Sequence, residues 1–253
     1  MGTPGVKHSS EQIAQDEEIP EGKVSHFRGL SARGNYLSAD RPEIQFATKE
    51  ICRFMSKPTK LSVESLKRLG RFLEGRRRLV YVYGWQMEVD GVDVYADTDH
   101  AGCLRTRKST SGGCILLGAH LLKSWSMTQP IITLSSGEAE LHGVVKAAAG
   151  GLGFLSLLAD FGVTLRLRLW TDSTASKGIC ARQGLGKVRH LDVQDLWIQQ
   201  RIRNGDFELY KIPGERNPGD LFTKLVSAVK GLNSYCSCWA ATTEKGGPSQ
   251  HLH

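Results

Sequence analysis

The chain has 253 residues, of which 40% are hydrophobic and 23% are charged, so it can bury the core of one large domain or of a medium domain with appendages. Its formal net charge of +7 favours polyanionic partners but does not indicate a fold. The start lacks the apolar segment of a secretion signal, and no run approaches the ~18 apolar residues of a membrane span. Six cysteines without paired CxxC motifs argue against a disulfide framework. We therefore expect a cytoplasmic or nuclear protein with no membrane partner.

Both ends of the chain are predicted to be disordered, since residues 1–30 are polar and acidic and residues 229–253 lack periodicity. Residues 31–85 are predicted to form a small helical segment. Its first helix is expected to begin at Asp40 as the N-cap, with Glu43 three residues later as the partner in a capping box. A second helix is expected to end at Gly75.

Residues 90–228 have the pattern of an α/β domain. Apolar and polar residues alternate up to Asp97, which predicts a first strand, and "GCILLGAHLLKSWS" predicts two more. A long helix is expected from "LSSGEAEL", a fourth strand at "LRLRLWTD", two further helices, a fifth strand at "FELYKIP" and a last helix at "NPGDLFTKLV". This order predicts a mixed five-stranded sheet with helices packed against it.

Acidic residues recur at the ends of these predicted elements. Asp97 ends the first strand, Glu138 and Glu140 lie in the first turns of the long helix, Asp172 ends the fourth strand, and Asp220 lies in the first turn of the last helix. If the first and fourth strands are parallel neighbours, Asp97 and Asp172 stand side by side, where each raises the pKa of the other unless a cation neutralises them. Oxygen-only ligands on rigid elements suit Mg²⁺ or Mn²⁺. The sequence therefore predicts a divalent-metal site.

Each of these residues, taken singly, also has a structural explanation. Asp220 is favoured at a helix N-terminus by the helix dipole, and Asp172 with Ser173 could cap the next helix. Asp99 could be a turn residue.

The helix pattern does not choose between Glu138 and Glu140. Ser135 and Glu138 fit a capping box, which would occupy Glu138 with backbone, but Glu138 also falls nearer than Glu140 to the apolar stripe of the helix.

Six motifs in this order resemble the ribonuclease H domain of copia-type retrotransposon polyproteins: "YADTDHAG", "RKSTSGG", "LSSGEAEL", "WTDSTAS", "RHLD" and "DLFTKL". Upstream, "DRPEIQFATKEICRFMSKPTK" and "LKRLGRFLEG" resemble the segment that joins reverse transcriptase to that domain in the same polyproteins. The resemblance covers roughly residues 30–228.

The resemblance implies a ribonuclease H-like fold and an endonuclease that cuts the RNA strand of an RNA–DNA hybrid with two Mg²⁺ ions, for which Mn²⁺ could substitute. By motif, the metal ligands and catalytic residues would be Asp97, Glu140, Asp172 and Asp220. The resemblance thus selects Glu140 over Glu138 and Asp97 over Asp99.

The hybrid is the expected partner, together with the polymerase domain of the same polyprotein. A basic, hydroxyl-rich loop starts beside Asp97, within reach of phosphates and sugars, and such contacts position a duplex without reading its sequence. The residues expected to contact nucleic acid are Arg105, Arg107, Lys108, Ser109, Thr110, Ser173 and His190.

Two departures from the family pattern favour an alternative. Cellular ribonucleases H carry a histidine on the loop after the fifth strand, whereas "KIPGERNPGD" has none and offers Glu215 as a substitute. No reverse transcriptase aspartate pair lies upstream, so we expect the C-terminal part of a polyprotein that does not synthesise DNA alone. The alternative is a catalytically weak or inactive nucleic-acid-binding remnant of a retroelement.

Overall fold

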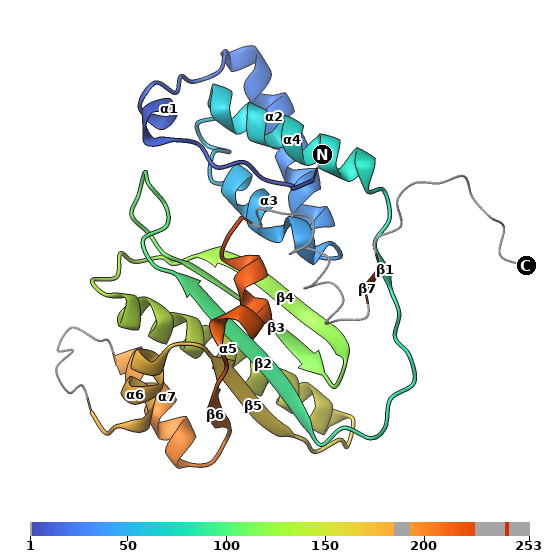
Figure 1. Ribbon diagram of the computed structural model, residues 1–253, viewed down its shortest axis with the longest axis vertical. Helices are drawn as coiled ribbons and strands as arrows, with labels where there is room; N and C mark the ends of the chain where they lie inside the picture. The colour runs from blue at the N-terminus through green and yellow to red at the C-terminus, as the bar shows by residue number, and fades with distance from the viewer. Residues whose placement is uncertain (1, 185–192, 226–240, 243–253) are drawn as a thin grey trace, which may run out of the picture. The chain divides into compact units, whose positions relative to one another are not determined.

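The computed structural model describes residues 2–184, 193–225 and 241–242 (Figure 1). The chain divides into two compact units. One unit comprises Met1–Gly84 and Leu225–His253, and the other is Trp85–Lys224.

The first unit is helical. Its helices are α1 (Ser10–Ala14), α2 (Glu21–Leu37), the 3₁₀-helix η1 (Pro42–Ile44), α3 (Gln45–Cys52) and α4 (Lys60–Gly75). Their buried apolar side chains form a small core of Val24, Phe27, Ile44, Ala47, Ile51, Leu69 and Phe72. A short strand, β1 (Val80–Tyr81), pairs antiparallel with β7 (Ala241–Thr242).

The prediction of disorder over residues 1–30 is wrong. Helix α1 begins with a capping box, in which the Ser9 side chain accepts from the backbone of Gln12 and the Gln12 side chain accepts from the backbone of Ser9. Helix α2 buries Val24 and Phe27, which lie three residues apart on one face. The burial of these two side chains stabilises a segment whose polar, acidic composition had predicted disorder. Within residues 229–253, only β7 is described, and it is a strand.

The predicted helix start at Asp40 is also wrong. The segment opens with η1, and no side chain caps it. Glu43 is buried and accepts a hydrogen bond from Arg41 Nε at 2.6 Å, so the carboxylate does not complete a capping box. Helix α4 ends at Gly75, as predicted, and begins after a capping box of Thr59 and Ser62.

The second unit contains a five-stranded mixed sheet. Its elements are β2 (Gly91–Asp99), β3 (Thr110–Leu117), β4 (His120–Thr128), α5 (Ser136–Asp160), β5 (Arg166–Thr171), α6 (Thr174–Ala181), α7 (Val193–Arg203), β6 (Glu208–Lys211), and the 3₁₀-helices η2 (Gly214–Arg216) and η3 (Pro218–Phe222). The strand order is β4-β3-β2-β5-β6, with β2, β3 and β4 antiparallel and β5 and β6 parallel to β2. The predicted mixed sheet is confirmed, but the last predicted helix is a five-residue 3₁₀-helix.

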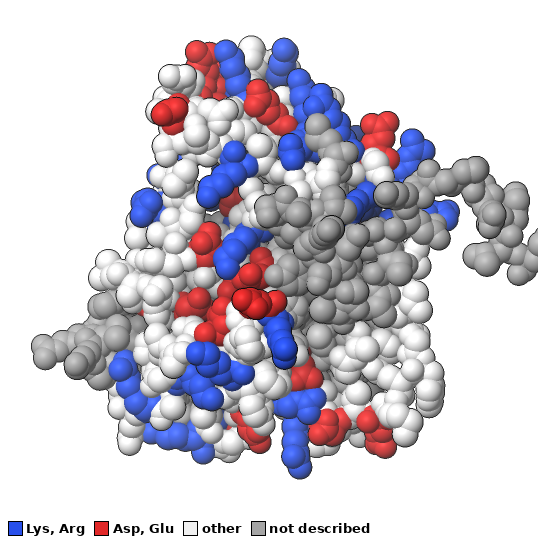
Figure 2. Space-filling view, in the orientation of Figure 1, with Lys and Arg blue, Asp and Glu red and all other residues white. Residues whose placement is uncertain are grey.

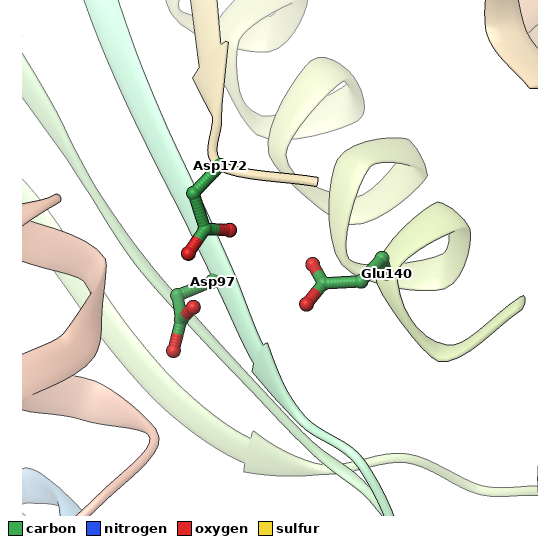
Figure 3. A group of neighbouring side chains, drawn as sticks. All are labelled: Asp97, Glu140 and Asp172. Carbon is green, nitrogen blue, oxygen red and sulfur yellow. The ribbon is translucent and has the colours of Figure 1, made fainter. Parts of the chain in front are cut away.

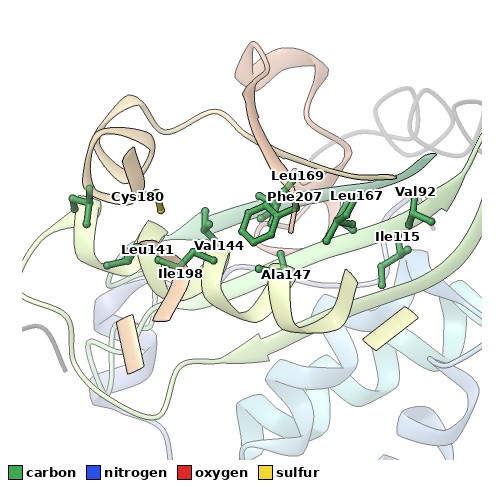
Figure 4. Packing of buried hydrophobic residues seen from close by; sticks show 14 residues of the cluster. Val92, Ile115, Leu141, Val144, Ala147, Leu167, Leu169, Cys180, Ile198 and Phe207 are labelled. Carbon is green, nitrogen blue, oxygen red and sulfur yellow. The ribbon is translucent and has the colours of Figure 1, made fainter. Parts of the chain in front are cut away.

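Helix α5 packs across one face of the sheet and closes the core (Figure 4). Leu141 and Val144 of this helix lie in one buried cluster with Val94 and Leu169 of the sheet. At Gly151, a Cβ atom would lie 2.7 Å from a methyl group of Leu167, so glycine allows this helix to approach the sheet closely.

The length and apolar composition of α5 would also suffice to cross a membrane, because an 18-residue window has a mean hydropathy of 1.4. One third of this window is buried, and its buried residues pack on the sheet as in the core helix of an α/β domain.

The opposite face of the sheet carries a row of stacked rings. Tyr95, Trp170 and Tyr210 are paired across β2, β5 and β6, with ring centroids 6.0 and 4.7 Å apart. The next row holds Arg168, whose Nε and Nη2 donate to the two carboxylate oxygens of Asp93 at 2.9 and 2.8 Å. These contacts tie the parallel strands together on the face that α5 does not cover.

We expect Leu169→Ala to lower the free energy of unfolding by about 3 kcal/mol, because this side chain is 0% exposed and its loss leaves a cavity between β5 and α5. Urea-induced unfolding followed by circular dichroism measures the change. The matched control is Leu122→Ala, at a side chain that is 36% exposed, which should stay within about 0.5 kcal/mol of wild type. Equal losses in the two variants would contradict this account of the core.

Candidate active site

Three carboxylates meet where β2 and β5 end. Ala96 of β2 is paired with Thr171 of β5 in parallel register, so the next residues, Asp97, which is still paired with β3, and Asp172, which follows β5, lie side by side. Glu140 reaches the same place from the first turns of α5 (Figure 3). One carboxylate oxygen of each residue lies within 4.8 Å of the others. We call Asp97, Glu140 and Asp172 the acidic cluster.

The structure decides between Glu138 and Glu140, a choice that the helix pattern left open. Glu138 is buried, and its Oε2 accepts a hydrogen bond from the backbone N–H of Leu134 at 2.8 Å. Its own N–H donates to Ser135 Oγ at 3.2 Å. Ser135 is therefore the N-cap of α5, the Glu138 carboxylate binds the backbone just before it, and Glu140 is the residue of this helix that enters the acidic cluster.

Asp220, the fourth predicted ligand, lies on η3 beside the acidic cluster. It is not among the described residues whose oxygens all lie within 4.8 Å of one another. Its Oδ1 lies 2.8 Å from the Nζ of Lys224, with which it forms an ion pair. The structure therefore brings three of the four predicted ligands together. The fourth, Asp220, lies beside them and is paired with Lys224.

Buried side chains hold η3 against β2. Asn217 Nδ2 donates to the Ala96 carbonyl at 2.9 Å, and Asn217 Oδ1 accepts from the N–H of Gly219 at 3.0 Å. A Cβ atom at Gly219 would lie 2.9 Å from the Cβ of Asp97, so this contact requires glycine. The hydroxyl of Thr223 donates to Asp97 Oδ2.

Sequence reasoning missed Asn217, Thr223 and Lys224 as site residues. The available signal was their position in "NPGDLFTK", within four residues of Asp220.

The acidic cluster is electrostatically strained. Burial, together with repulsion from Asp220 and Asp172, raises the pKa of Asp97 to about 7, although the hydrogen bond from Thr223 opposes the shift. Burial and repulsion from Asp97 and Asp172 raise the pKa of Glu140 to about 9. Burial and Asp220 also raise the pKa of Asp172. Oxygen donors that repel one another at this range fit a hard divalent cation, which would relieve the repulsion.

Only some of the residues between β2 and β3 that were predicted to contact nucleic acid are exposed. Arg105 and Arg107 are exposed. Lys108 Nζ donates to the Pro130 carbonyl at 2.6 Å, which ties this loop to the segment before α5. Ser109 and Thr110 are 0% and 4% exposed. Both hydroxyl residues therefore serve the packing of the loop, and the exposed arginines remain the candidates for phosphate contact.

Two other predicted residues lie near the acidic cluster. Ser173 is the N-cap of α6, where its Oγ accepts from the N–H of Ser176 at 3.1 Å. Glu215 is exposed on η2, next to Gly214, where a Cβ atom would lie 3.0 Å from Asp172 Oδ2. His190 lies outside the described residues.

The strand order and the helices that flank the sheet define an α/β fold of the ribonuclease H-like class, as predicted. Among solved structures, the chain is similar to LC11-RNase H1, isolated from compost by a metagenomic approach, at 18% sequence identity. The match covers 57% of this chain and 99% of that one, with a TM-score of 0.39.

The curated relatives include a retrovirus-related Pol polyprotein from transposon RE1 of Arabidopsis thaliana, which is 25% identical over 206 residues, 80% of this chain and 14% of the relative. An uncharacterized mitochondrial protein of the same plant is 34% identical over 129 residues, 49% of this chain and 52% of that protein. The chain thus spans between about one seventh and one half of the length of these relatives. No protein-family model matches it. The chain is thus similar to a part of the retrovirus-related Pol polyproteins of transposons.

We expect the free energy of unfolding of the metal-free protein to fall as the pH rises from 4.5 to about 9. Glu140 has its raised pKa only in the folded state, so the folded state binds more protons than the unfolded state in this window. Glu140→Gln should flatten this slope, whereas Glu64→Gln, at an exposed position, should keep it. Urea titrations at several pH values in a chelator measure both. The same slope in all three proteins would contradict the strain assigned to Glu140.

Proposed function

We propose that this chain is the ribonuclease H part of a copia-type retrotransposon polyprotein and that it cuts the RNA strand of RNA–DNA hybrids. The observation that carries the proposal is the acidic cluster, in which residues 97, 140 and 172 converge from two parallel strands and a helix. The similarity to retrovirus-related Pol polyproteins of transposons supports the same activity.

The residues of the acidic cluster would hold two Mg²⁺ ions, with Asp220 as a further ligand. When bound, such ions activate a water molecule and stabilise the leaving 3′ oxygen of a phosphodiester. The carboxylates would hold and orient the ions, and no side chain of the protein has to act as a nucleophile. Thr223 fixes the rotamer of Asp97, and Asn217 fixes η3 and therefore Asp220.

The substrate would lie across the end of β2, where the exposed Arg105 and Arg107 follow Asp97 in the chain. Arginines there would contact phosphates and set the register of the duplex without reading its sequence. A hybrid is distinguished from duplex DNA by its shape and by 2′-hydroxyls in a wide minor groove. The polymerase of the same polyprotein would be the partner that delivers the hybrid.

We expect the protein to cut the RNA strand of a hybrid in Mg²⁺ and not in a chelator, and Asp172→Asn to reduce the rate by at least about a thousandfold, because a neutral amide weakens metal binding. A hybrid labelled at the 5′ end of its RNA reports cleavage on a gel. Asp160→Asn, at an exposed position at the end of α5, is the matched control and should cut like wild type.

Circular dichroism should show the same fold for wild type and Asp172→Asn. A folded wild-type protein that binds the hybrid in Mg²⁺ without cutting it would instead identify a nucleic-acid-binding remnant. Equal cutting of duplex DNA would contradict the proposed substrate.

We expect Arg105→Ala with Arg107→Ala to weaken hybrid binding and to reduce the slope of log K against log salt by about 2, since each lost phosphate contact removes about one released counterion. Lys123→Ala with Lys146→Ala removes the same charge from exposed positions on β4 and α5 and should leave the slope unchanged. Fluorescence anisotropy of a labelled hybrid at several salt concentrations measures both. Equal slopes in the two double variants would show that the loop does not contact phosphates.

A further inference from the structure

Lys224 is a cation built into the edge of the acidic cluster. Its Nζ lies 2.8 Å from Asp220 Oδ1, with the lysine side chain 53% exposed and the aspartate side chain 25% exposed. Backbone hydrogen bonds from the N–H groups of Thr223 and Lys224 to the Asp220 carbonyl fold the chain back here. Figure 2 shows acidic side chains gathered near η3 with basic side chains next to them.

The charge of Lys224 acts on more than its ion-pair partner. Burial raises the pKa of Asp97, Glu140 and Asp172, and the charge of Lys224 opposes that rise at all three carboxyls. Burial alone would lower the pKa of Lys224, but Asp220, Asp97 and Asp172 outweigh it and raise that pKa. The lysine is therefore coupled to the whole group of carboxylates.

Ion pairs between surface residues four positions apart are common, and the Asp220–Lys224 contact could be one of them. Its position next to the acidic cluster is not explained in this way. Exposed pairs of this kind hold their geometry loosely and contribute little. Here the preceding residue, Thr223, is buried and donates to Asp97, so the backbone that carries Lys224 is fixed against the acidic cluster. The backbone of Lys224 is thus fixed next to the acidic cluster, and the ion pair with Asp220 directs its half-exposed ammonium group there.

We propose that Lys224 is a tethered counter-cation that occupies Asp220 and partly neutralises the acidic cluster until divalent ions bind, and that it is displaced when they do. This inference rests on the proposed function for the identity of the ions. It accounts for the position of Asp220, which is paired with a lysine next to the cluster. It also makes Lys224 a residue that sets the affinity for divalent ions, because a bound ion must replace an existing positive charge.

The experiment compares Lys224→Met, Lys224→Arg and the control Lys123→Met in the full chain. Lys224→Met keeps the length of the side chain and removes its charge, and Lys123→Met removes the same charge from an exposed position on the edge strand β4. Mg²⁺ binding is measured by isothermal titration calorimetry without nucleic acid. We expect Lys224→Met to lower the dissociation constant for Mg²⁺ about three- to tenfold, and the other two variants to stay near wild type.

A second measurement needs no metal. In a chelator, Lys224→Met should lower the Tm by about 3 °C relative to Lys123→Met, because the carboxylates lose their counter-cation. In an Asp220→Asn background this difference should shrink, since the two residues are coupled in a double-mutant cycle.

The inference about Lys224 is overturned if wild type binds Mg²⁺ but Lys224→Met binds it no more tightly, or if Lys224→Met and Lys123→Met have the same Tm in the chelator. A wild-type protein that shows no Mg²⁺ binding would overturn the proposed metal site, and the exchange at Lys224 with it. The two failures are therefore distinguishable.

Discussion

The parallel pairing of β2 and β5 is the constraint on which the site depends. Because Ala96 and Thr171 are register partners, the next residue of each strand is an aspartate, and the two carboxylates cannot avoid each other. The central position of β2 in the sheet adds burial to this repulsion, since β3 flanks it on one side and β5 on the other. A fold that only needed stability would place apolar side chains there. The repulsion within the cluster is relieved either by protonation, which the raised pKa values of Asp97 and Glu140 favour, or by a bound cation.

The stretch from Asn217 to Lys224 supplies the remaining parts of the site in eight residues. Its amide anchors to the backbone of β2, its glycine allows contact with Asp97, and its threonine and lysine reach two different carboxylates. The 3₁₀-helix η3 covers only Pro218–Phe222, where a longer regular helix was predicted, and Asn217, Thr223 and Lys224 flank it.

The sequence predicts the features of this protein that follow from periodicity and connectivity. The sequence placed Asp97 beside Asp172 on the condition that the first and fourth strands are parallel neighbours, and the structure meets that condition. The choice between Glu138 and Glu140 depends on how α5 leans on the sheet, which no local pattern contains. The helices within residues 1–30 were missed for a related reason: the few apolar residues of α2 matter only once they pack in a core.

Asp93 and Asp97 show how one strand can carry a structural and a functional carboxylate. Residues 93, 95 and 97 alternate to the same face of β2. Asp93 accepts from two nitrogens of Arg168 and from the indole of Trp170, so its charge is matched by a neighbouring strand. Four residues further on, Asp97 receives one hydroxyl from Thr223 and faces two more carboxylates. The same side chain on the same face thus stabilises the sheet at one end and, at the other, leaves a negative charge that a cation can bind.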